Sequence, residues 1–370
     1  MKVLFSMVFP IIVLLYFFLL YSLYDISPSS FKDRGIKGLT FLISFLLLQL
    51  LRLYCQDTFP DIPNYKDVFN EIKPLTYVIK NKGTGMEYYD PETMTQVDFG
   101  FRFFISIFKV LSGSYSTFLI FVSIIELWSL SFFCRRFKIS LLLIMPIYIA
   151  LTYTAFQIGM LRQALAFCIF LISLCYIQKL PVYLFLVILG CFFHKSMIFC
   201  IFFFWCNKKV SIKYIHFLFL LSLMVYLLRV NYVGTFWNML SLTDMGRVNH
   251  YLDNGVDMSF LGVGFWERVI LYVLMVIVYT KSFKAKTYDP KHTLIFNLGV
   301  SLIIFQLFFF ASPTITSRLR YYIVIFPLLY LVLYMRENIR NKQLKVILYI
   351  PLVLYLCMYI FTQSGYLRGF

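Results

Sequence analysis

Long apolar runs, separated by short segments rich in lysine and arginine, dominate the 370-residue sequence. Hydrophobic residues make up 61% of the chain and charged residues only 14%, which is typical of a protein whose solvent is lipid. In lipid, backbone polar groups must be satisfied inside each segment, and helices do this. The sequence therefore predicts an all-α polytopic membrane protein, with residues 1–370 forming one integral membrane domain.

About ten runs are long enough to span a bilayer as helices. They cover residues 3–24, 36–54, 115–134, 139–156, 160–178, 210–230, 265–280, 293–311, 321–335 and 344–362. The first run lacks a small-residue cleavage pattern and is predicted to be a span rather than a signal peptide. Placing the lysine- and arginine-rich loops in the cytoplasm puts both termini outside.

The apolar segment 181–206 is interrupted by His194 and Lys195. The same orientation requires this segment to enter and leave the membrane by one face. Two α-helical legs of about twelve residues are too short to cross about 30 Å of hydrocarbon. The sequence favours a re-entrant hairpin over 181–206, and one long tilted span is the alternative.

Two external loops are predicted between the spans. The first covers residues 55–110 and ends in an amphipathic segment that begins at Asp98, which predicts a helix in the outer interface. The second covers residues 231–264 and contains Arg247 and Tyr251. Long loops on a compact membrane protein are often functional.

The net charge of +17 does not indicate a nucleic-acid-binding protein, because the cations are spread over the loops as membrane topology requires. The eight cysteines fall mostly in apolar runs without a CxxC pair, which favours packing roles. Four histidines without an HExxH motif give no sign of a metal site. We expect no cofactor and no bound metal.

Polar residues inside apolar runs are candidates for chemistry, since charges there are costly. Arg162 and Gln163 open one run; the arginine could bind a diphosphate bidentately, or only reach the lipid headgroups. His194 could act as a general base, or satisfy buried partners. Arg318 and Arg320 would face nearly opposite ways on a helix, so that only one need reach a substrate. Glu126 lies within a span and is expected to be neutral or paired.

These residues belong to a set of spaced motifs. The motifs are Asp61-x-x-Asn64-Tyr65, Asp98-Phe99-Gly100-Phe101, Arg162-Gln163-Ala164-x-Ala166, Phe193-His194-Lys195-Ser196, Arg247-x-x-x-Tyr251 and Arg318-x-Arg320-Tyr321-Tyr322. In this order, across about residues 55–325, the chain resembles the EpsG family of exopolysaccharide proteins, the Wzy-type O-antigen polymerases. The family often carries Glu where this chain has Asp98, which leaves the role of that carboxylate open.

The resemblance implies a glycosyltransferase of the multi-spanning, lipid-phosphosugar-using type (GT-C-like), in the bacterial inner membrane with its site facing the periplasm. It would join undecaprenyl-diphosphate-linked oligosaccharide repeat units, among membrane lipids and beside a chain-length regulator and a flippase of the same pathway. Arg162 and His194 would be catalytic. The substrate-binding residues would be Gln163, Arg318, Arg320, Asp61, Asn64, Tyr65, Asp98, Arg102, Lys195, Arg247 and Tyr251.

Three other functions fit parts of the pattern. An O-antigen ligase would use the same donor but a lipid A-core acceptor. A lipid-linked oligosaccharide flippase or other transporter would show inverted repeats and broken helices, which the sequence lacks. A membrane O-acyltransferase would depend on acetyl-coenzyme A.

Overall fold

The computed structural model describes residues 2–26, 34–55, 61–90, 95–229, 262–284, 290–310, 312–339 and 341–366. The chain divides into two compact units, one formed by Met1–Ile201 with Ile339–Phe370 and the other by Phe202–Asn338. The predicted second external loop, with Arg247 and Tyr251, lies almost wholly outside the described residues. Apart from one very short β-ladder, the regular structure of the described residues is helical.

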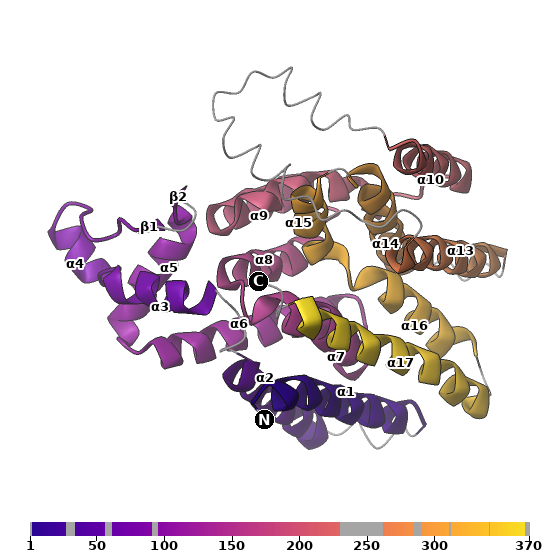
Figure 1. Ribbon diagram of the computed structural model, residues 1–370, viewed down its shortest axis with the longest axis horizontal. Helices are drawn as coiled ribbons and strands as arrows, with labels where there is room; N and C mark the ends of the chain where they lie inside the picture. The colour runs from indigo at the N-terminus through magenta and orange to yellow at the C-terminus, as the bar shows by residue number, and fades with distance from the viewer. Residues whose placement is uncertain are drawn as a thin grey trace. The chain divides into compact units, whose positions relative to one another are not determined.

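The first unit contains most of the helices and the ladder (Figure 1). Its elements are α1 (Lys2–Ile26), α2 (Arg34–Cys55), α3 (Asp61–Glu71), α4 (Leu75–Lys80), β1 (Tyr89–Asp90), β2 (Thr95–Gln96), α5 (Phe99–Leu111), α6 (Tyr115–Arg136), α7 (Leu141–Tyr148), the π-helix η3 (Ile149–Gln157), α8 (Leu161–Cys175), α9 (Leu180–Phe193) and α17 (Lys342–Tyr366). The strands are antiparallel, with Tyr89 opposite Gln96. The hydroxyl groups of Tyr21 and Tyr349 are 2.8 Å apart and join α1 to α17.

The second unit is a smaller set of helices. They are α10 (Ile212–Leu227), α13 (Val263–Lys284), α14 (Pro290–Phe308), α15 (Pro313–Ile323) and α16 (Phe326–Asn338). The 3-10 helix η4 (Lys195–Asn207) begins in the first unit and ends in this one. Asn297 of α14 donates to the carbonyls of Cys206 and Lys208 at 2.8 and 2.9 Å, which fixes the end of η4 against α14.

Five described helical segments are long and apolar enough to cross a membrane: Tyr115–Arg136, Val263–Lys281, Pro290–Phe308, Ile315–Asn338 and Gln343–Ile360. Seven shorter apolar helices accompany them. The chain is therefore a helical, polytopic membrane protein. The count of about ten spans and the GT-C-like arrangement stay predictions.

Two predicted spans are interrupted. Residues 139–156 form α7, which contains Pro146, followed by the π-helix η3. In η3 the Thr154 hydroxyl donates to the carbonyl of Ile149 at 2.9 Å. Residues 321–335 cover the junction of α15 and α16 rather than one regular helix.

The segment 181–206 folds back on itself at His194. Residues 180–193 form α9, His194 is extended, and η4 follows. The Tyr183 hydroxyl donates to the Cys200 carbonyl, and a Cβ at Gly190 would lie 2.7 Å from the Met197 side chain. Because a 3-10 helix rises about 2.0 Å per residue, the 13 residues of η4 extend further than α-helical legs would. The length of the two legs therefore does not decide between a re-entrant hairpin and a segment that crosses the membrane, and the hairpin stays a prediction.

Helix α5 is more than an amphipathic surface helix, because its polar side is not turned to water. Its polar side chains donate to backbone carbonyls of the preceding segment: Arg102 to Met86, Ser106 to Lys73, and Lys109 to Asn70 and Ile72. A second stripe joins a buried aromatic and aliphatic core: Phe101, Ile105 and Phe108. A third stripe is exposed and apolar: Phe99, Phe103, Ile107 and Val110. Within the first unit, helix α5 thus holds the end of α3 and the segment that leads from it to β1.

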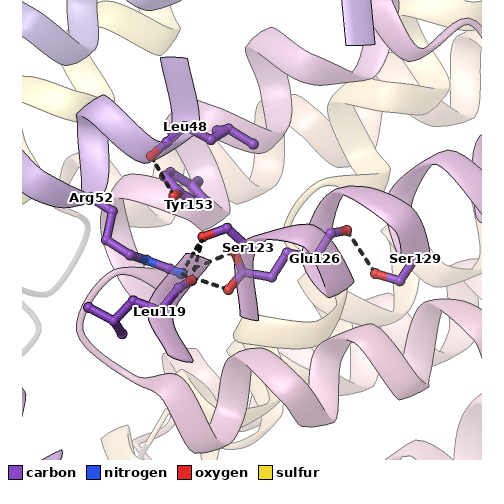
Figure 2. A network of polar contacts seen from close by, with 7 residues as sticks. All are labelled: Leu48, Arg52, Leu119, Ser123, Glu126, Ser129 and Tyr153. Carbon is purple, nitrogen blue, oxygen red and sulfur yellow. Dashed lines mark hydrogen bonds and ion pairs between the residues drawn. The ribbon is translucent and has the colours of Figure 1, made fainter. Parts of the chain in front are cut away.

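A buried ion pair joins α2 to α6 (Figure 2). Arg52 donates from Nη2 to both Glu126 carboxylate oxygens, at 2.8 and 3.1 Å, and from Nη1 to the Leu119 carbonyl and the Ser123 hydroxyl. The Tyr153 ring lies 5.7 Å from the guanidinium carbon, and its hydroxyl donates to Leu48 at 2.7 Å. The pairing expected for Glu126 is present, and its partner is Arg52.

Removing one member of this pair should destabilise the protein strongly, since the other charge is left buried. We expect Arg52→Ala to lower the free energy of unfolding by about 3–5 kcal/mol. The double variant Arg52→Met/Glu126→Leu should lose much less, because both charges disappear together. Thermal unfolding of the purified protein in detergent checks this. An Arg52→Ala protein as stable as the double variant would contradict it.

Candidate functional site

Arg162, the second residue of α8, pairs with the carboxylate of Asp98, which directly precedes α5. Arg162 Nη1 donates to Asp98 Oδ2 at 3.2 Å. The Arg162 and Asp98 side chains are 24% and 10% exposed, whereas Arg52 and Glu126 are 2% and 0% exposed. The Tyr65 ring of α3 has its centroid 6.0 Å from the guanidinium carbon, within reach of a cation–π contact. Three segments distant in sequence thus meet at one partly open cation.

The start of α5 approaches the end of α9 closely because residue 100 is glycine. A Cβ there would lie 2.7 Å from the backbone carbonyl of Phe192, too close for any side chain. One turn later the rings of Phe104 and Phe193 meet edge-to-face with centroids 6.0 Å apart. These contacts bring the His194 turn to the helix that follows Asp98.

The charges around Asp98 come from several elements. Burial raises the pKa of the Asp98 carboxyl above the ordinary aspartate value, and the positive charges of Arg162 and Lys195 offset this only in part. The Asp98 charge also interacts electrostatically with Arg102, one turn along α5. Asp98 is therefore a half-buried carboxylate among cations.

His194 lies in the turn between α9 and η4 and is half-buried. Its Nδ1 lies 2.6 Å from the Ser196 hydroxyl oxygen and accepts the Ser196 backbone N–H at 3.3 Å. We call Tyr65, Asp98, Arg162 and Lys195 the Arg162 cluster. It combines two cations, one carboxylate and an aromatic ring, and its cations are of the kind that bind anionic oxygens.

Arg102 is buried, and its guanidinium donates to the Met86 carbonyl. Substrate binding by Arg102 stays a prediction. Burial lowers the pKa of Arg102, and Asp98 and Glu87 act in the opposite direction. Its described contacts hold the loop before β1 against α5. Gln163 is 2% exposed, inside the first unit.

The other predicted residues are less closely placed. Asn64 is half-buried on α3, and Asp61 begins that helix. Arg318 and Arg320 are half-buried on α15 of the second unit, next to the buried Tyr321 and Tyr322. Arg247 and Tyr251 lie outside the described residues.

Sequence reasoning gave no role to Ser196 or to Arg52. A hydroxyl two residues after a histidine is a signal for a local side-chain contact, and Ser196 could have been found in this way. Arg52 ends an apolar run, where reaching the headgroups is the ordinary expectation. Within the part of the chain that the structure describes, no three His, Cys, Asp or Glu side chains gather as metal ligands would.

No curated protein and no solved structure is significantly similar to the chain. A family match, by contrast, covers residues 38–367, nearly the whole chain, and includes every residue of the Arg162 cluster. This confirms the resemblance seen in the spaced motifs. The chain belongs to the EpsG family, a family of Wzy-like polymerases.

Proposed function

We propose that this polysaccharide polymerase joins undecaprenyl-diphosphate-linked oligosaccharide repeat units at the periplasmic face of the bacterial inner membrane. The observation that carries the proposal is the partly open Arg162–Asp98 pair, with the Lys195 charge near it. Placing an ion pair inside a membrane protein costs free energy, so such a pair often marks a functional site. Partial exposure to solvent is what a ligand would need in order to reach it.

Arg162 is the residue we assign to the diphosphate of the donor. Its planar guanidinium can bind two phosphate oxygens at once, which an ammonium cannot. As the bond between the anomeric carbon and the diphosphate oxygen breaks, negative charge grows on the leaving group, and a fixed guanidinium stabilises it. Arg318 and Arg320, in the other unit, stay separate predictions for substrate binding.

The directions of α6 and α8 support a site on the outer face. At one end, Leu161 and Leu165 of α8 share a buried core with Phe118 and Val122 of α6. At the other end, Arg136 Nε donates to the Cys175 carbonyl at 3.3 Å. The 22 residues of α6 span about 33 Å at 1.5 Å per residue, about one hydrocarbon thickness.

The cationic turn after α6 carries Arg135, Arg136 and Lys138. The positive-inside rule assigns such a turn to the cytoplasm. Arg162 lies at the opposite end of α8 from the residue that Arg136 contacts. These two steps support a periplasmic site, which suits a donor presented on the outer leaflet.

Arg162→Ala should abolish polymer while the protein still inserts in the membrane, because the diphosphate loses its bidentate contact. Arg162→Lys should recover only part of the activity, since its charge remains but its planar fork does not. Glycan ladders from cells that carry the rest of the pathway measure the chain length. Lys179→Ala, which removes an exposed cation at the other end of α9, is the matched control and should leave the ladder unchanged.

The ladder also separates polymerase from ligase. Loss of a polymerase leaves single-repeat lipopolysaccharide, whereas loss of a ligase leaves none. We expect the single-repeat product in Arg162→Ala. Full-length polymer in that variant would contradict the assignment of Arg162, and complete loss of capped lipopolysaccharide would favour the ligase.

Polymerisation should also weaken as the pH falls through the raised Asp98 pKa. Because the Asp98 pKa is raised, the carboxylate takes up a proton at a higher pH than an ordinary aspartate, and its ion pair with Arg162 is present only above that pKa. Arg162, Lys195 and Arg102 are the charged groups that the structure places around Asp98. Initial rates in membrane vesicles across pH should show this acid limb, and Asp98→Asn should remove it. An unchanged limb in Asp98→Asn would assign it to another group.

A further inference from the structure

The exposed apolar stripe of α5 begins at the residue that follows Asp98. Phe99 and Phe103 are 53% and 39% exposed. Their rings stack one turn apart, with centroids separated by 5.8 Å and planes inclined at 13°. Asp98 itself accepts the hydrogen bond from Arg162. An apolar surface therefore starts directly beside the partly open ion pair.

A second exposed stripe runs along α9. It consists of Phe185, Ile188, Leu189 and Phe192. Their spacing of three and four residues puts them on one side of the helix. Helix α9 packs along α8 and follows it after a short turn at residues 176–179, so it runs back toward the end of α8 that carries Arg162. Phe192 lies at that end of the stripe, and Phe185 lies about 10.5 Å further along the helix axis.

Gly100 brings the two stripes together. A Cβ at this position would lie 2.8 Å from the Phe192 Cβ, so the Phe192 side chain leaves α9 at the first turn of α5. The next residue, Phe193, packs against Phe104, which contacts the buried core. Phe192 is 51% exposed. The exposed apolar surface thus continues from Phe99 past Gly100 onto α9.

The position of this surface distinguishes it from other lipid-facing surfaces of the chain. Bilayer lipids cover any apolar helix face, and an apolar ligand gains little by replacing them. A prenyl chain attached to a diphosphate at Arg162, however, is held at a high effective concentration beside Phe99. Untethered lipids have no such advantage, so the tether favours the chain of the donor on this surface.

We propose that Phe99 and Phe103 of α5, together with the exposed stripe of α9, form a track that binds the polyprenyl chain of the lipid-linked donor. The rings of α5 contact the part of the chain next to the diphosphate, and Phe185 contacts a part further from it. The proposal rests on the proposed function, since it takes Arg162 as the diphosphate site.

Binding of two prenyl diphosphates to the full-length protein in lipid nanodiscs tests the track. Undecaprenyl diphosphate has a long chain and geranyl diphosphate a much shorter one. Phe99→Ala/Phe103→Ala should weaken the binding of both ligands on the order of 3–10-fold, because each ring gives up several van der Waals contacts. Phe185→Ala/Ile188→Ala should weaken only undecaprenyl diphosphate, since the short chain ends before these residues. Partition of a ligand into the bilayer is the same for every variant and cancels in the comparison.

The matched control removes two exposed rings elsewhere on the chain. Trp128 of α6 and Phe217 of α10 are 48% and 62% exposed, and Trp128→Ala/Phe217→Ala should leave both affinities unchanged. A loss in this control as large as in the α5 and α9 variants would overturn the track. Unchanged binding of undecaprenyl diphosphate in the α5 and α9 variants would also overturn it and leave the surface to bilayer lipid.

Arg162→Ala separates the track from the proposed function, and it should weaken both ligands. If it does so while the α5 and α9 variants bind normally, the track fails and the diphosphate site stands. If Arg162→Ala binds normally while the α9 variant loses only the long chain, the diphosphate assignment fails and the track stands.

Discussion

The cost of placing charge in hydrocarbon governs this structure, because an arginine or a glutamate inside the bilayer needs a partner, a water-filled cavity or access to the headgroups. The first unit does this twice. Arg52 and Glu126 are sealed from solvent and bonded on several sides, whereas Arg162 and Asp98 remain partly exposed beside a third charge. The same guanidinium–carboxylate chemistry thus joins two helices in one place and leaves an ion pair partly exposed in the other.

The open pair depends on the packing of α5. Three of its side chains donate to carbonyls of the preceding segment, and a glycine lets its first turn approach the end of α9. Asp98 consequently lies next to α8, at the end of a segment that the side chains of α5 hold in place. The sealed pair adds to this because Glu126 lies on α6, whose buried core includes the first residues of α8. Site geometry and fold stability are therefore linked through α6.

Apolar runs predicted most helices to within a few residues, since length and hydrophobicity decide a membrane helix almost alone. The spaced motifs likewise indicated Tyr65, Asp98, Arg162 and Lys195, which the structure brings together. What sequence could not supply was the pairing of distant residues. Arg52 and Glu126 are 74 positions apart, and no periodic pattern connects them.

Local geometry was also hidden from the sequence. The π-helix after Pro146 and the 3-10 helix after His194 arise from how the backbone finds hydrogen-bond partners, which hydrophobic pattern does not encode. The polar stripe of α5 looked like the water-facing side of an interfacial helix. It instead binds loop carbonyls, because those carbonyls need donors as much as the side chains need acceptors.

Photo-crosslinking of a labelled lipid-linked repeat unit tests the central claim that substrate binds at the Arg162 cluster. A photoreactive residue would replace Lys195 in one protein and Lys179 in another; both lysines are exposed, and α9, 14 residues long, separates them by about 21 Å at 1.5 Å per residue. The account predicts labelling at position 195 that Arg162→Ala abolishes, and none at position 179. Labelling at 179 alone, or labelling at 195 that survives the loss of Arg162, would contradict it.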